Sequence, residues 1–261
     1  MRNKTLNVLW CILLPVILIC CTDNPADVDA DPDENGPPDR SENLKPVGSS
    51  ASDLLSGGSY TRLVVEITYV EGFSPTDNAL NMVKGFLEAR VNKPGGVVVT
   101  VNDPIPPPGN STYTVQQIRE LEEKYRRTYT EGTNISVHFL FLDKDFSQSS
   151  NVLGIAYLNT SMALFQNIIQ NNSGGIGRPS RSVLERTVMK HELGHILGLV
   201  NIGSPMQTGH QDHANGAHCD NDQCLMYHAV NTIDFLATLT GGSVPQPDQN
   251  CIDDLRANGG K

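Results

Sequence analysis

The pattern of apolar and polar residues predicts an α/β domain. Runs rich in β-branched residues are typical of strands, and they occur at 62–70, 96–101, 135–142 and 152–159. Apolar residues recur at helical spacing over 76–91 and 114–129. The order is β-α-β-α-β-β, followed by one more helix, which predicts a mixed, mostly parallel twisted sheet.

This last helix carries the most informative motif of the chain. From residue 191 the sequence reads HELGHILG, an HExxH motif with a glycine three residues further on. On a helix, His191 and His195 project from one face and can share one zinc ion. Glu192 stands beside them, where it can take a proton from a zinc-bound water. Gly198 suits a helix end, where the backbone needs a positive φ.

The start of this helix has its own signal. Ser182 is followed three residues later by Glu185, which has the form of a capping box. We therefore expect the helix to begin at Ser182.

A catalytic zinc site usually has three protein ligands and one open position, so a third ligand must follow the motif. The candidates are His210, His213 and His218. His218 opens the run HCDNDQCLM, which holds two cysteines and Met226.

This arrangement resembles the metzincin metallopeptidases, and the archaemetzincins in particular. Their pattern is HExxHxxGxxHC, four residues, then CxM. The motif from His191 to Gly198 matches its first part, and His218, Cys219, Cys224 and Met226 match its second part with the same internal spacing. The resemblance implies that His218 is the third zinc ligand and that Met226 is the methionine of a Met-turn beneath the metal.

The spacing between the two parts departs from the family. The third histidine of the pattern falls on Asn201 here, and residues 199–217 separate Gly198 from His218 where the pattern has two residues. His218 is our first choice for the third ligand, with His210 and His213 as alternatives.

Cysteines of this pattern contribute to a second, structural zinc site in the family. The family's downstream CxxC is absent, and Cys251 is the one cysteine that follows Cys224. We therefore expect a disulfide among Cys219, Cys224 and Cys251 rather than a four-cysteine zinc site.

The resemblance implies a metzincin-like zincin domain with the activity of a zinc endopeptidase. A peptide or protein substrate would add as a strand to a sheet edge, for which residues 152–159 are the candidate. The alternative is a non-catalytic surface lipoprotein that binds zinc or another ligand, because Asn201 holds the expected ligand position. Glu192 argues against this alternative, since zinc binding alone needs no base.

The N-terminus predicts export and lipidation. Residues 1–21 combine Arg2, Lys4 and an apolar run ending in LICC, which resembles a bacterial lipobox with Cys21 as the lipidated residue. An ordinary secretion signal is the alternative. Residues 22–59 are rich in aspartate and proline and predict a disordered tether, similar to the acidic export signal of Bacteroidetes surface lipoproteins or to a plain spacer. Residues 60–261 remain for the peptidase domain.

The net charge of the chain limits which partners it can bind. The formal net charge is −10, and no basic cluster is present, so nucleic acid is excluded as a partner. The lipid predicts attachment to a membrane of the cell envelope, with the outer membrane facing the periplasm or the cell surface as the expected place.

Overall fold

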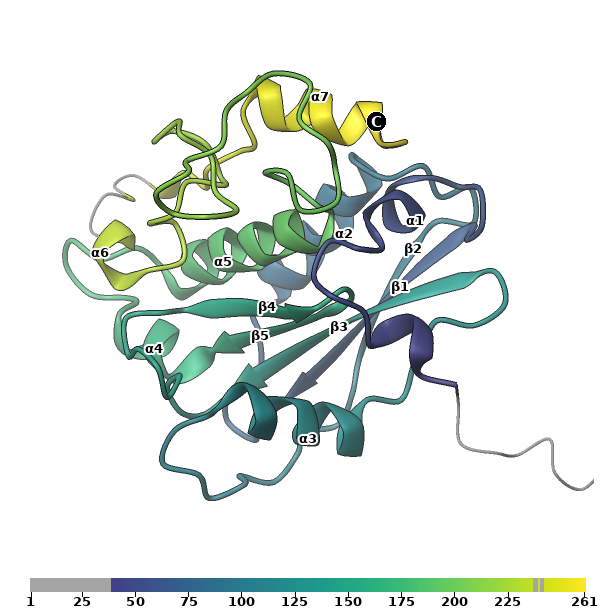
Figure 1. The fold of residues 1–261 in the computed structure, drawn as a ribbon. Helices are drawn as coiled ribbons and strands as arrows, with labels where there is room; N and C mark the ends of the chain where they lie inside the picture. Colours follow the sequence, from purple (N-terminus) through teal and green to yellow (C-terminus); the bar gives the residue numbers. More distant parts are fainter. Residues whose placement is uncertain (1–38, 237–238, 240–241) are drawn as a thin grey trace, which may run out of the picture. The chain divides into compact units, whose positions relative to one another are not determined.

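Five short apolar strands form one sheet that carries the rest of the domain (Figure 1). The computed structural model describes residues 39–236, 239 and 242–261. The elements are η1 (Ser41–Asn43), α1 (Ala51–Leu55), β1 (Arg62–Tyr69), α2 (Asp77–Glu88), β2 (Val97–Val101), α3 (Val115–Tyr125), β3 (Asn134–Leu142), β4 (Gly154–Leu158), β5 (Ser161–Phe165), α4 (Gln166–Asn171), α5 (Arg181–Ile196), α6 (Ile233–Leu236) and α7 (Gln249–Ala257).

The strand order is β2-β1-β3-β5-β4. β1 pairs in parallel with β2 and β3, β3 pairs in parallel with β5, and β4 runs antiparallel to β5 at the edge. The predicted mixed, mostly parallel sheet is confirmed, and the segment predicted as its edge contains β4. β5 was not predicted, because the predicted strand ends at residue 159 and the short run that follows Thr160 was not recognised as a separate strand.

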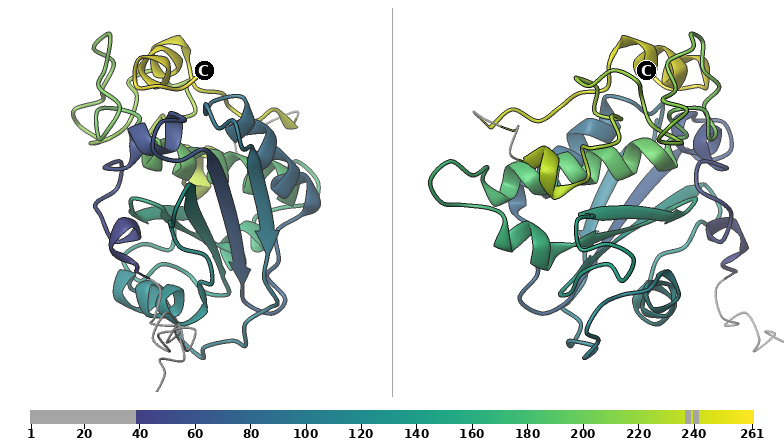
Figure 2. Two further views of the ribbon diagram at one scale, coloured as in Figure 1. Left: turned by 90° about the vertical axis from the view of Figure 1, so that its right-hand side faces the viewer. Right: turned by 60° about the vertical axis from the view of Figure 1, so that its left-hand side comes forward.

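Helices α2 and α5 lie on one face of the sheet and α3 lies on the other (Figures 1 and 2). α5 is buried along most of its length, on polar as well as apolar positions. Its N-cap is Ser180, whose side chain accepts from the backbone N–H of Val183. The predicted start at Ser182 is therefore wrong. Glu185 does not cap this helix. It is fully buried and accepts hydrogen bonds from Thr76, the N-cap residue of α2.

Residues 39–59 belong to the fold, which corrects the predicted boundary of the tether at residue 59. Leu54 and Leu55 are fully buried in the apolar core. The buried amide of Asn43 donates to Ser136 O at 3.1 Å and accepts from Thr130 N at 2.8 Å. Composition was a poor guide to this boundary because the prolines of the segment end at Pro46 and the apolar residues of α1 follow them.

The predicted lipidation signal and the first part of the predicted tether fall on residues 1–38, which lie outside the described residues. Among the helices that the structure describes, none is long and apolar enough to cross a membrane.

Truncating Leu54 tests whether this segment supports the domain. Leu54→Ala should lower the free energy of unfolding by about 2–5 kcal/mol, because a fully buried leucine leaves a cavity. Leu44→Ala is the matched control, since Leu44 is 53% exposed in the same segment. Equal denaturation midpoints for the two variants would mean that residues 39–59 do not stabilise the domain, as expected of a tether.

Candidate active site

Three imidazoles converge where α5 approaches the loop that follows it. His191 and His195, one turn apart on α5, have their Nε2 atoms 3.2 Å apart. The ring of His218 lies 5.3 Å from that of His191 and 5.1 Å from that of His195, centroid to centroid. Their ligand atoms all lie within 4.8 Å of one another. Two nitrogens bound to one tetrahedral zinc ion at about 2.0–2.1 Å are about 3.3 Å apart, so this spacing fits zinc.

Hydrogen bonds at the other ring nitrogens orient two of these imidazoles. His191 Nδ1 lies 2.8 Å from Leu225 O, and His218 Nδ1 lies 2.7 Å from Asn215 O. A carbonyl oxygen only accepts, so each Nδ1 carries the proton and each Nε2 keeps a free lone pair. Nε2 of His218 is buried without a hydrogen-bond partner, which is the state expected of an atom that awaits a metal.

Electrostatics keep the three imidazoles neutral. Burial lowers the pKa of His191 to about 3, with the neighbouring His218 adding to the effect. Burial likewise lowers the pKa of His195 and that of His218. Because metal binding needs neutral imidazoles, the ligands are prepared without competition from protons.

Glu192 points from α5 toward the edge strand β4. Its Oε1 lies 3.5 Å from Asn231 Nδ2, and a Cβ at Gly154 would lie only 3.1 Å from the same oxygen. Burial raises the pKa of Glu192 to about 8, while the hydrogen bond from Asn231 opposes this rise. A zinc ion beside the carboxylate would also oppose it, because a positive charge favours the ionised form. The carboxylate therefore lies buried against the start of the edge strand.

Met226 packs directly against α5 on the side of the histidines. A Cβ at Gly194 would lie 2.2 Å from Met226 Sδ, so only glycine leaves room for the fully buried methionine. Gly198 has φ +79, as its place at the helix end predicts, and Asn201 follows with φ 70. The glycines of the motif thus let the chain turn and return closely beneath the helix.

The alternatives for the third ligand lie elsewhere. His213 is exposed on the surface of the long segment 199–217. His210 is buried, but it lies against Cys219 Sγ at 3.3 Å and not among the other histidines. Of the three candidates, the structure brings His218 alone to the HExxH pair.

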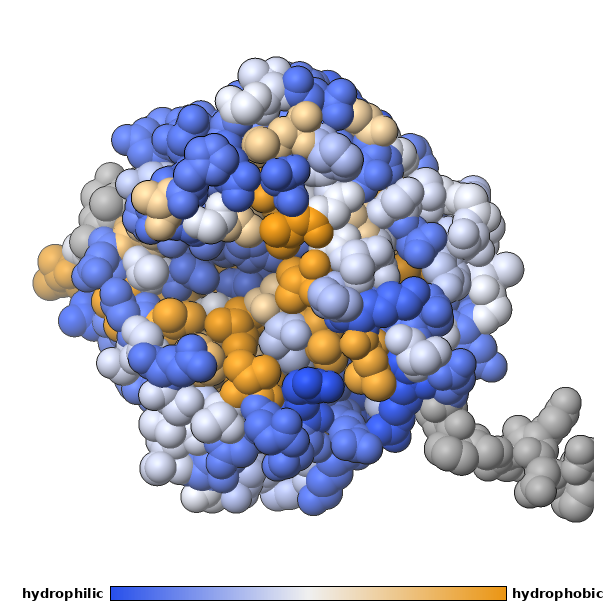
Figure 3. All heavy atoms as spheres, viewed as in Figure 1, coloured by the Kyte–Doolittle hydropathy of each residue, from blue (hydrophilic) through white to orange (hydrophobic). Residues whose placement is uncertain are grey.

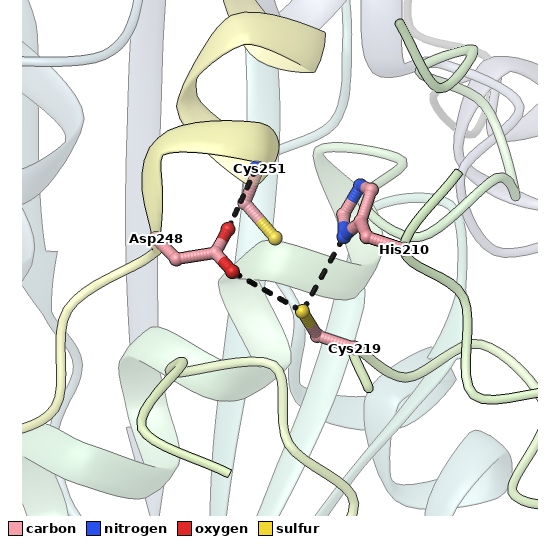
Figure 4. A group of neighbouring side chains, drawn as sticks. All are labelled: His210, Cys219, Asp248 and Cys251. Atoms are coloured by element: carbon pink, nitrogen blue, oxygen red, sulfur yellow. Dashed lines mark hydrogen bonds between the residues drawn. The ribbon is translucent and has the colours of Figure 1, made fainter. Parts of the chain in front are cut away.

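The expected disulfide is absent from the part of the chain that the structure describes. Cys219, Cys224 and Cys251 are all free and buried. Cys251 arrives in the first turn of α7, a helix that the sequence pattern did not predict. It joins Cys219, His210 and Asp248 in a second cluster of potential ligands (Figure 4).

The face that carries β4 is hollowed between this strand and the loops above α5, and apolar residues lie along the hollow (Figure 3). A cavity of about 520 Å³ is lined in part by Tyr227, the residue after Met226, and by Phe235, Leu239 and Val244.

Known proteins resemble parts of this chain. Residues 98–200 match the model of Metallo-peptidase family M12B Reprolysin-like. An archaemetzincin from Methanopyrus kandleri is 18% identical over 77% of this chain and 96% of its own, with a TM-score of 0.46. An archaemetzincin from Archaeoglobus fulgidus, complexed with malonate, is 16% identical over 73% of this chain and 99% of its own, with a TM-score of 0.44. No curated protein matches the chain.

The matched segment runs from β2 through the HExxH helix and ends where the long insertion begins. Together with the three converging imidazoles, it defines the class as a zinc-dependent metallopeptidase. The matched segment is similar to the Reprolysin-like metallopeptidases, and it lies in a fold with a five-stranded, mostly parallel sheet and a helix that carries the HExxH motif.

Replacing histidines of the loop tests the choice of the third ligand. His218→Ala should weaken zinc binding at the active site more than about 100-fold, beyond the loss typical of residues that only orient a ligand. His213→Ala, from the same loop, should leave zinc binding unchanged because its side chain is exposed. Metal competition with a chelator measures both, and equal affinities for the two variants would contradict the assignment.

Proposed function

We propose that His191, His195 and His218 bind the catalytic zinc and that Glu192 acts as the general base of an endopeptidase. The observation that carries the proposal is the meeting of three imidazoles at one point, together with the buried carboxylate of the neighbouring Glu192, which lies against the edge strand β4. A zinc site without catalysis has no use for such a carboxylate.

Zinc, when bound, lowers the pKa of a water ligand and polarises the scissile carbonyl. Glu192 takes the proton from the attacking water and later delivers it to the leaving amine. Asn231, 3.5 Å from Glu192 Oε1, and the close approach of Gly154 hold the carboxylate toward the substrate side. Proton transfer by a positioned side chain contributes about 10²–10⁴-fold to rate.

We assign the substrate to the outer edge of β4, where an extended peptide adds as a further strand. The edge is paired at its start, because Leu153 N donates to Asn231 O and Val152 bridges to Thr232. From Gly154 onward, β4 pairs only with β5 among the described strands. The partly exposed stretch 155–157 therefore offers backbone groups beside Glu192.

The cavity lined by Tyr227 is our candidate for the pocket that selects a substrate side chain. Its wall combines the apolar residues Phe235, Leu239 and Val244 with the carboxylate of Asp234. Backbone pairing along β4 is tolerant of sequence, so this pocket would supply the selectivity.

We further propose that the chain is a lipoprotein, anchored through Cys21 to a membrane of the cell envelope, with the outer membrane as the expected place. The basic start, the apolar run and the cysteine at its end support this. In this proposal residues 22–38, which are rich in aspartate and proline, are the tether.

Glu192→Gln tests the general base. The variant should bind zinc as the wild type does but lose peptidase activity about 10²–10⁴-fold, since the amide cannot accept the proton. Cleavage of an unbiased peptide library and metal content are measured side by side. A variant with full metal content and undiminished cleavage would remove Glu192 from the mechanism.

Cys21→Ala tests the anchor. In a bacterial host, we expect the wild type in the detergent phase of a phase-separation assay and the variant outside it, because the thiol that carries the lipid is gone. Cys20→Ala is the matched control and should keep the wild-type behaviour. Detergent partitioning of Cys21→Ala, or its absence in the wild type, would argue for an ordinary secretion signal.

A further inference from the structure

The inserted segment 199–217 folds back on itself before it reaches His218. Gln211 pairs with Cys219 in an antiparallel bridge. Next to this bridge, Asp212 N donates to His218 O at 2.8 Å. His218 therefore lies in the second arm of a hairpin, opposite Asp212. Because the whole insertion separates His218 from the HExxH helix, the direction of its ring depends on this hairpin and not on the helix alone.

The side chain of Asp212 closes the turn at the end of the hairpin. Its Oδ1 accepts from Ala214 N at 3.1 Å, and its Oδ2 accepts from Asn215 Nδ2 at 2.6 Å. Asn215 N also donates to Asp212 O at 3.0 Å. An aspartate that accepts from the backbone two residues further on forms an Asx-turn, which fixes a short loop locally. The backbone between Asp212 and Asn215 is thus held by the carboxylate.

This turn presents the carbonyl that orients the ring of His218. Asn215 O accepts the proton of His218 Nδ1 at 2.7 Å. The hydrogen bond at one ring nitrogen fixes the tautomer and the direction of the other, which is the nitrogen free to bind metal. Nε2 of His218 is buried without a partner in the described part of the chain. The position of the Asn215 carbonyl therefore decides where this nitrogen points.

The carboxylate of Asp212 also faces the segment after Met226. Its Oδ2 lies 3.5 Å from His228 Nδ1, and the side chain of Asp212 is 20% exposed. The ring of His228 in turn lies 6.4 Å from that of His218, centroid to centroid. Asp212 thus contacts both arms of the chain that border the third imidazole. An aspartate that only solvates a loop needs none of these contacts.

We propose that Asp212 is a positioning residue for the catalytic zinc, because it fixes the turn whose carbonyl aims His218. The inference rests on the proposed role of His218 as the third zinc ligand. Loss of a group that hydrogen-bonds a metal ligand directly costs about 10–100-fold in metal affinity. Asp212 acts through Asn215, so we expect the lower end of this range.

Zinc affinity tests the inference without a substrate. Asp212→Ala should bind zinc at the active site about 10-fold more weakly than the wild type in chelator competition. Asp220→Asn is the matched control, because it removes one negative charge from an exposed residue close to His218 and leaves the turn unchanged. Equal affinities for Asp212→Ala and Asp220→Asn would overturn the proposal.

A reciprocal exchange separates the hydrogen bonds from the charge. In Asp212→Asn the new amide oxygen can accept from Ala214 N or from Asn215 Nδ2, but not from both, so zinc binding should weaken. Adding Asn215→Asp exchanges donor and acceptor, and the pair can form again with the charge retained. The double variant should regain most of the lost affinity. A double variant that binds zinc no better than Asp212→Asn would contradict the proposed role.

The ring of His218 offers a second readout, by proton NMR of the metal-free protein. Its Nδ1–H, held by Asn215 O, should give a resonance protected from exchange with water and identified by its absence in His218→Ala. The resonance should broaden or vanish in Asp212→Ala and return in the double variant. The denaturation midpoint should stay the same, because the turn lies at the surface. A resonance unchanged in Asp212→Ala would overturn the proposal.

Failure of the zinc assignment gives a different result. If His218→Ala keeps the zinc affinity of the wild type, His218 is not a ligand and the proposed metal site is wrong. The ring resonance then still decides whether Asp212 orients this side chain.

Discussion

The burial of α5 is the constraint on which the rest of the structure depends. A helix covered on nearly all sides must find a partner for each polar side chain that it carries. Glu185 meets this demand with hydrogen bonds from Thr76 and Arg181, and Lys190 with one to Gln246. His191 and His195 meet it only in part, because their Nε2 atoms face each other and the lone pair of His218. The unused lone pairs of these imidazole nitrogens lie close together in a buried place, and a bound cation would satisfy them.

The same constraint explains the small residues around the motif. Gly154 allows β4 to approach Val188, where a Cβ would lie 2.6 Å from Cγ1. Gly194 allows Met226 to pack beneath the histidines. Because both positions lack a side chain, the edge strand and Met226 can approach the HExxH helix closely.

Local features could be predicted from the sequence, and long-range ones could not. Periodicity is a property of neighbouring residues, so α2, α3 and strands β1 to β4 follow from it, as does the pairing of His191 with His195. The third ligand depends on how the 199–217 segment folds, and the motif alone left three histidines open. α1 and α7 have too few residues for a clear period, and their places are fixed by tertiary contacts of Leu54 and Cys251.

The cysteines show why counting is a weak guide to pairing. Three thiols suggest one disulfide and one spare thiol, but Cys219, Cys224 and Cys251 are all free in the described part of the chain. The sequence offered His210 as a ligand of the catalytic zinc, and the structure turns it to the sulfurs, because Asp254 in α7 captures its other nitrogen. Asp254 Oδ1 also accepts from Gln207 N at 2.7 Å, so one buried carboxylate anchors both the loop and its histidine. His210 is thus held between Asp254 and Cys219, the residue that follows His218, so the inserted segment is fixed close to the HExxH helix.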